Sequence, residues 1–192
     1  MPFCLKRKES VARGWHRIVH NEFDAVGVSV GALRRADGRE EAVHDARRHL
    51  KRLRALYQLC REPLGKELCA RETAILRDVA RHLSAVRDVE VKVAALEVIL
   101  QETQLGQNAA VRKLHLAWMR ERDRQVRLTS SPARVRGLLD SLNAARRRFD
   151  LLPILEGDWH LVAQALSRSY RRARNGFGAI KDQPADDERL HE

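Results

Sequence analysis

The chain has 192 residues, which suits one compact domain, and its 44% hydrophobic and 33% charged residues disfavour a wholly disordered chain. Only 5% aromatic residues, with 10 Gly and 5 Pro, disfavour a sandwich or barrel with many tight turns, so we expect helices. The excess of 37 Lys and Arg over 26 Asp and Glu leaves a net charge of +11, which predicts an anionic partner: nucleic acid, an acidic membrane or polyphosphate.

Apolar residues at helical spacing predict four helices in the first half of the chain. The first carries the apolar stripe from Val11 to Leu33 and is expected to end at Asp37-Gly38, and the second runs from Glu40 to about Arg61. A third is expected from about Lys66 to Ser84. The fourth is expected to follow Arg87-Asp88 and to continue to about residue 100.

Three further helices are predicted in the second half. The fifth contains the apolar residues Val111, Leu114 and Trp118. Ser131 and Pro132 are a good start signal for the sixth, because serine can cap a helix and proline at its first position loses no needed hydrogen bond. The seventh is expected to begin with Asp158 as a cap and to bury Val162, Leu166, Ala173, Phe177 and Ile180.

No segment shows the alternating pattern of a strand. We therefore predict an all-α fold of antiparallel helical hairpins and bundles, with about seven helices in a single domain over residues 1–192. The three cysteines form no even set and lack C-x-x-C spacing, so they are interpreted as reduced thiols. No secretory signal or membrane span is recognisable, so a cytoplasmic location and no membrane partner are predicted.

The stretch from His44 to Arg54 is the most informative in the sequence. At about 100° per residue, His44, Arg47, Lys51 and Arg54 share one helix face, with Arg48 and Arg52 beside them and apolar residues opposite. No acidic residue lies between Arg47 and Arg54, so the cations are not neutralised along the helix. A solvated amphipathic face is one interpretation, and a polyanion that relieves the repulsion is the other.

Other cations form smaller groups. Arg168, Arg171, Arg172 and Arg174 flank Tyr170, and Arg146-Arg147-Arg148 is a third basic run. Arg87 is expected near a helix start, where free backbone N–H groups and the helix dipole favour phosphate oxygens, or else in a local pair with Asp88 or Glu90.

These motifs resemble the conserved histidine α-helical domain family, abbreviated CHAD. His44-Asp45-Ala46-Arg47 followed by Lys51-Arg52-Leu53-Arg54 is similar to the family's first signature helix. Residues 83–91 resemble its leucine-glycine and Arg-Asp-x-Asp-Val element, with Ser84 in the glycine place and Glu90 in the second aspartate place. Residues 169–174 and 187–192 resemble its approach to a second histidine helix, so the likeness extends from about residue 9 to the end.

The resemblance implies a pseudo-twofold helical domain that binds inorganic polyphosphate in a basic channel and associates with polyphosphate granules. Because no catalytic motif is recognisable, we predict binding without catalysis and without a cofactor. Because the matched sequence stops at the start of the second signature helix, we expect a domain incomplete at its carboxyl end, with an uncovered apolar groove and a tendency to self-associate. The residues that match the family's polyphosphate-binding positions are His44, Arg47, Lys51, Arg52, Arg54, Arg77, Arg87, Tyr170, Arg171, Arg174 and His191.

The chemistry of these residues agrees with that implication. Polyphosphate offers repeated negative charge, which arginine binds with two parallel hydrogen bonds and lysine binds as a point charge. A nucleic acid is the alternative, although aromatic platforms for bases are scarce. His44-Asp45 is also similar to the dyad of HD phosphohydrolases, but no further ligands follow at a recognisable spacing.

His16, His20 and Asp24 lie one helical turn apart and could hold a metal ion. A polar helix flank explains them equally well, and we predict no metal site.

Overall fold

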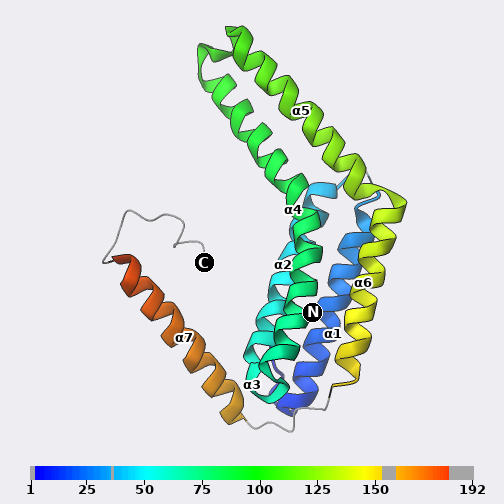
Figure 1. Cartoon of the computed structure of the whole chain (residues 1–192), viewed down its shortest axis with the longest axis vertical. Coiled ribbons are helices and arrows are strands. Elements are labelled where there is room, and N and C mark those ends of the chain that lie inside the picture. Colours follow the sequence, from blue (N-terminus) through cyan, green and yellow to red (C-terminus); the bar gives the residue numbers. More distant parts are fainter. Residues whose placement is uncertain (1–2, 36, 153–158, 182–192) are drawn as a thin grey trace.

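The structure is a computed structural model that describes residues 3–35, 37–152 and 159–181 (Figure 1). These residues form seven α-helices, one short 3-10 helix and no strand, which confirms the all-α prediction. In chain order the elements are α1 (Val11–Ala32), α2 (Arg39–Leu59), α3 (Arg61–Leu64), α4 (Lys66–Glu102), η1 (Gln104–Gln107), α5 (Ala109–Ser130), α6 (Pro132–Asp150) and α7 (Trp159–Lys181).

Local sequence explains where several helices begin. The side chain of Ser10 caps α1 by accepting a hydrogen bond of 3.3 Å from the backbone N–H of Arg13. Ser131 caps α6 in the same way and Pro132 is the first helical residue, as predicted. Gly38 precedes α2 with a φ of 72°, a left-handed conformation that glycine adopts without a steric penalty.

The long helix α4 corrects the sequence prediction. Residues 66–84 and the segment after Arg87-Asp88 were expected to form two helices, but they form one continuous helix of 37 residues. Neither Gly nor Pro occurs between residues 66 and 102, and Ser84 fits the helix because its hydroxyl donates to the carbonyl oxygen of Ala80 at 3.1 Å. The helix count still agrees, because the unpredicted short helix α3 offsets the merged pair.

The core is a four-helix bundle of α1, α2, α6 and the first half of α4 (Figure 1). The apolar stripe predicted for α2 is fully buried, including Val43, Leu50 and Leu53. The bundle is formed mainly by aliphatic side chains that interdigitate between helices, with Tyr57 and Phe149 in edge contact at a centroid distance of 6.2 Å.

Two parts extend from this bundle. The second half of α4 pairs with α5 as a projecting helical hairpin (Figure 1). In helix α5, Thr129 is the buried residue. Helix α7 starts beside α3 and runs away from the bundle. The prediction that α7 buries its apolar stripe is therefore wrong for Leu166, Ala173 and Phe177, which are exposed, Leu166 by 54% and Phe177 by 69%. The buried contact of α7 is made around Ala165 instead. The side chain of Ile180 lies outside the described ones. The expected cap Asp158 lies outside the described residues.

The three cysteines are free thiols at separate positions. Cys60 and Cys69 are buried, and burial raises the pKa of Cys60 to about 12. No helix in the described part of the chain is long and apolar enough to cross a membrane.

A buried ion pair joins α4 to α6. Glu72 is 2% exposed, and its two carboxylate oxygens accept hydrogen bonds of 2.9 and 3.0 Å from the guanidinium of Arg148. Arg71 adds a weaker contact at 3.3 Å. A buried carboxylate needs such donors, because burial without them removes its hydration without compensation.

Replacing Arg148 with Met should therefore destabilise the bundle by about 1–3 kcal/mol, the cost of leaving a buried polar group unsatisfied. Urea denaturation followed by circular dichroism measures the change. Arg136→Met, an exposed position on the same helix, is the matched control and should change the stability little. Equal effects of the two substitutions would show that the Glu72 pair does not hold α6 in place.

Candidate anion-binding site

The basic face of α2 lies along α4. Because Val43, Ala46, Leu50 and Leu53 turn into the core, the cations between them are left on the side of α2 that faces α4 and solvent. We call Arg47, Lys51 and Arg54 of α2 with Arg77 of α4 the basic seam. His44 and Lys51 are exposed, whereas Arg47 and Arg54 are half-buried.

Arg47 is fixed in the seam by hydrogen bonds. Its guanidinium donates to the hydroxyl of Ser84 and, at 3.5 Å, to the carbonyl oxygen of Ala80. Ser84 in turn donates to Ala80, so the three groups form one small network between α2 and α4. Ser84 was not among the predicted site residues. The network holds Arg47 in place through neutral oxygens, and no described residue forms an ion pair with it.

Arg54 of α2 and Arg77 of α4 are near enough for their charges to interact. The pKa of Arg54 is lowered, first by burial and second by the charge of Arg77. Among the residues that the structure describes, neither guanidinium forms an ion pair. Two arginines kept close without a counter-charge cost stability, and an anion between them would remove that cost.

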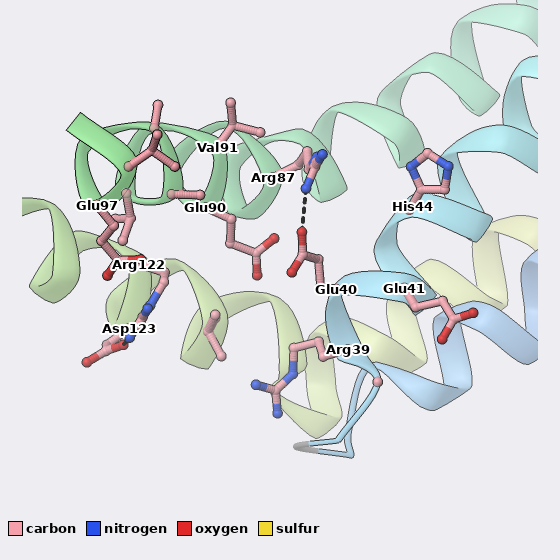
Figure 2. Close-up of a pocket in the computed structure, with 16 residues that line it drawn as sticks. Arg39, Glu40, Glu41, His44, Arg87, Glu90, Val91, Glu97, Arg122 and Asp123 are labelled. Atoms are coloured by element: carbon pink, nitrogen blue, oxygen red, sulfur yellow. Dashed lines mark hydrogen bonds and ion pairs between the residues drawn. The ribbon is translucent and has the colours of Figure 1, made fainter. Parts of the chain in front are cut away.

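The amino-terminal end of α2 has a different character. Arg87 lies in the middle of α4, so the expectation that free backbone N–H groups of a helix start surround it is wrong. It pairs with Glu40 of α2 at 2.5 Å instead of with its neighbours Asp88 or Glu90 (Figure 2). Figure 2 shows Glu90 pointing into the same groove, where burial and the charge of Glu40 raise its pKa.

This groove, of about 1200 Å³, lies between α2, α4 and α5 and is not a cationic site. His44 lines it at one side (Figure 2). Its acidic lining residues, Glu40, Glu41, Glu90, Glu97 and Asp123, outnumber its arginines, Arg39, Arg87 and Arg122. Size alone therefore does not identify the anion site, and Arg87 is already neutralised by an acid.

Arg52 also departs from the predicted arrangement. It points toward α1, where it lies 3.5 Å from Glu22 and stacks over the ring of Phe3 at 5.1 Å. Glu22 is buried and also contacts His49 at 2.6 Å. The reason is helical phase: Arg52 lies about 100° around the helix from Lys51, on the flank that packs against α1. The structure does not bring Arg52 to the seam.

A second group of cations lies where the seam reaches α3 and α7. A hollow of about 480 Å³ is bordered there by Arg61, Lys66, Arg77, Arg168 and Arg172. Among the described residues that line it, Glu62 is the acidic one, and it pairs with Arg168 at 2.9 Å. We call Arg61, Lys66, Arg168 and Arg172 the basic corner. Arg77 belongs to both seam and hollow, so the two groups are continuous.

The site residues predicted on α7 do not lie on the side of the helix that lines this hollow. Tyr170, Arg171 and Arg174 are exposed and do not line this hollow, whereas Arg168 and Arg172 do. The spacing of Ala165, Arg168 and Arg172 at three and four residues was the signal that could have selected the correct pair. His191 lies outside the described residues.

Two arginines of the basic run at residues 146–148 form contacts between helices of the bundle, whereas Arg147 is exposed. Arg148 binds Glu72, and Arg146 contacts His20 and Asp24. These two charges are held by protein groups rather than presented to a ligand.

These features define an all-helical domain in which one group of cations without a described ion-pair partner lies along the α2–α4 helix pair. The family model for the CHAD domain matches residues 17–192, more than half of the chain, and the chain belongs to the CHAD family. CHAD domains occur in polyphosphate-related proteins. Comparisons with curated proteins and with solved structures found no match.

Arg54→Gln should leave the stability unchanged or raise it slightly, because it removes a repulsion with Arg77. Thermal unfolding at low salt measures this, and Arg77→Gln should behave in the same way. The double variant should gain no more than either single one, since both remove the same repulsion. A clear loss of stability in both single variants would contradict the view that the two charges oppose each other.

Proposed function

We propose that this chain binds inorganic polyphosphate along the basic seam and the basic corner, and that it does so without catalysing turnover. The observation that carries the proposal is the pair Arg54 and Arg77, two interacting cations that form no ion pair with a described residue, with Arg77 also lining the hollow bordered by Arg61, Lys66, Arg168 and Arg172. Such a pair suits an anion that passes between the two helices.

The arrangement suits a linear polymer of phosphate more than a compact phosphate ligand. The cations follow α2 from Arg47 to Arg54, a rise of about 10 Å at 1.5 Å per residue, and then turn to the hollow beside α3. Helices hold the donors at fixed positions, so a chain that repeats the same charge can contact them in succession. Association with polyphosphate granules would follow from the same contacts.

The non-catalytic part of the proposal rests on the surroundings of the HD dyad. Asp45 pairs with Arg48 at 3.0 Å, and His44 faces the mixed-charge groove. Within the described residues, the dyad is not part of a cluster of His, Cys, Asp and Glu that could hold a metal ion. A hydrolase of the HD type needs such ligands to activate water.

A nucleic acid is the second candidate. The observation that favours it is Tyr170, which is 68% exposed on α7 beside Arg171 and could stack on an unpaired base.

Replacing Lys51 and Arg54 together by Gln should weaken binding to long polyphosphate at least about tenfold, the effect of losing one charged hydrogen bond or more. Arg47 is left intact because it connects α2 to α4. The control is Arg13→Gln with Arg136→Gln, two exposed cations on α1 and α6 that remove the same formal charge. Fluorescence anisotropy with labelled polyphosphate measures both. Equal losses would show that binding follows net charge alone.

Competition with duplex DNA, single-stranded RNA and pyrophosphate separates the alternatives, together with an assay for released orthophosphate. Preference for long polyphosphate without release supports the proposal. Preference for RNA that Tyr170→Ala removes would support the second candidate, and steady release of phosphate would contradict the non-catalytic assignment.

Polyphosphate affinity should also fall steeply with salt, because each neutralised phosphate releases a condensed counterion, as in nucleic acids. With six to ten contacts, a loss of about a thousandfold or more is expected between roughly 50 and 200 mM salt. Anisotropy titrations at four salt concentrations give the slope. An affinity that does not change over this range would contradict binding through the seam.

A further inference from the structure

Helices α1 and α6 bring together a second group of side chains, remote in sequence from the seam. His16 and His20 lie one turn apart on α1, and Asp150 is the last residue of α6. Oδ1 of Asp150 is 2.6 Å from Nε2 of His20 and 3.8 Å from Nε2 of His16. One ligand atom from each residue lies within 4.8 Å of the others. The sequence had pointed to Asp24 as the third member, and the fold supplies Asp150 instead.

The two separations from Asp150, 2.6 and 3.8 Å, lie on either side of the ligand spacing around a bound transition metal. Ligand atoms about 2.0–2.1 Å from a tetrahedral zinc ion lie roughly 3.4 Å apart. Small side-chain rotations can therefore bring the three donors around one ion. The side chains of His16 and Asp150 are 47% and 41% exposed, so the position between them is open to solvent and to a water ligand.

The two imidazoles are positioned by the bundle. Their rings stack with centroids 4.4 Å apart, and both contact the buried ring of Phe149, at 5.2 and 5.9 Å. Burial and the neighbouring His20 lower the pKa of His16, which favours the neutral imidazole that a metal requires. This packing limits the movement of both side chains before any ion binds.

In the absence of a metal ion, Arg146 determines which ring nitrogen of His20 carries the proton. Its guanidinium approaches Nδ1 of His20 at 2.9 and 3.1 Å and also contacts Asp24. Nδ1 must then accept, so the ring proton lies on Nε2 and is donated to Asp150. An ion at Nε2 would place that proton on Nδ1 instead, where it opposes the arginine donor. Metal binding therefore has to displace Arg146 from His20, which leaves it with Asp24.

We propose that His16, His20 and Asp150 bind one divalent transition-metal ion of the zinc class, and that the bound ion fastens α1 to the end of α6. Two imidazoles and one carboxylate suit Zn²⁺, Co²⁺, Ni²⁺ or Cu²⁺ rather than Mg²⁺ or Ca²⁺. The ion has a structural role, because it links α1 to α6, and its binding does not depend on polyphosphate.

Isothermal titration of untagged protein with ZnCl₂ at neutral pH tests the proposal. We expect one equivalent to bind and the thermal midpoint to rise by about 5–10 °C at a hundredfold excess over the dissociation constant. His16→Gln and Asp150→Asn should each weaken zinc binding at least about tenfold. His82→Gln, an exposed histidine of α4, is the matched control and should leave the affinity unchanged.

Arg146→Gln distinguishes this site from general histidine binding, because the amide oxygen of Gln can accept the proton on Nδ1. It should bind zinc more tightly than the unmodified chain, whereas a weaker site would contradict the displacement of Arg146. If a ligand variant fails to fold, cobalt absorption and the imidazole NMR signals of the unmodified protein replace it. No zinc binding at 1 mM, or shifts confined to other histidines, would overturn the proposal.

Discussion

The burial of one face of α2 is the constraint on which the rest of the structure depends. Because its aliphatic side chains are enclosed by α1, α4 and α6, the helix cannot rotate, and its cations must lie along α4. The buried apolar residues of α2 thus determine the position of its charged residues. A rotation of α2 that separated Arg54 from Arg77 would also expose Leu50 and Leu53 to water, at a cost of about 1.5–3 kcal/mol for each side chain.

The seam illustrates a balance between stability and binding. The fold neutralises many of its charges: Arg148 with Glu72, Arg87 with Glu40, Arg168 with Glu62. It does not neutralise Arg54 and Arg77 with described residues, although their proximity is unfavourable in the free protein. Functional sites often keep interactions that a search for stability alone would remove. The proposed polyphosphate ligand would supply the missing counter-charge.

The two ends of the α2–α4 pair differ in charge, and this difference favours polyanion binding at one end over the other. The groove near the start of α2 is rich in carboxylates, whereas the hollow near α3 is bordered by arginine and lysine. A polyanion is repelled at one end and attracted at the other, so the contacts should run from Arg47 toward α3 and α7. On the α1–α6 side, the cluster of His16, His20 and Asp150 forms a separate site with a different chemistry.

The sequence by itself determined the helical class, the cap at Ser131, and the basic face of α2, because helical periodicity and capping act over only a few residues. It also identified the family from motifs that the family model matches. Only the tertiary structure decided which charged side chains lie close together: Arg77 and Arg54, Arg87 and Glu40, and Arg52 and Glu22. It likewise joined two predicted helices into α4 and brought Asp150 to His20 from 130 residues away. Such partners depend on how distant helices pack, which no local pattern in the chain encodes.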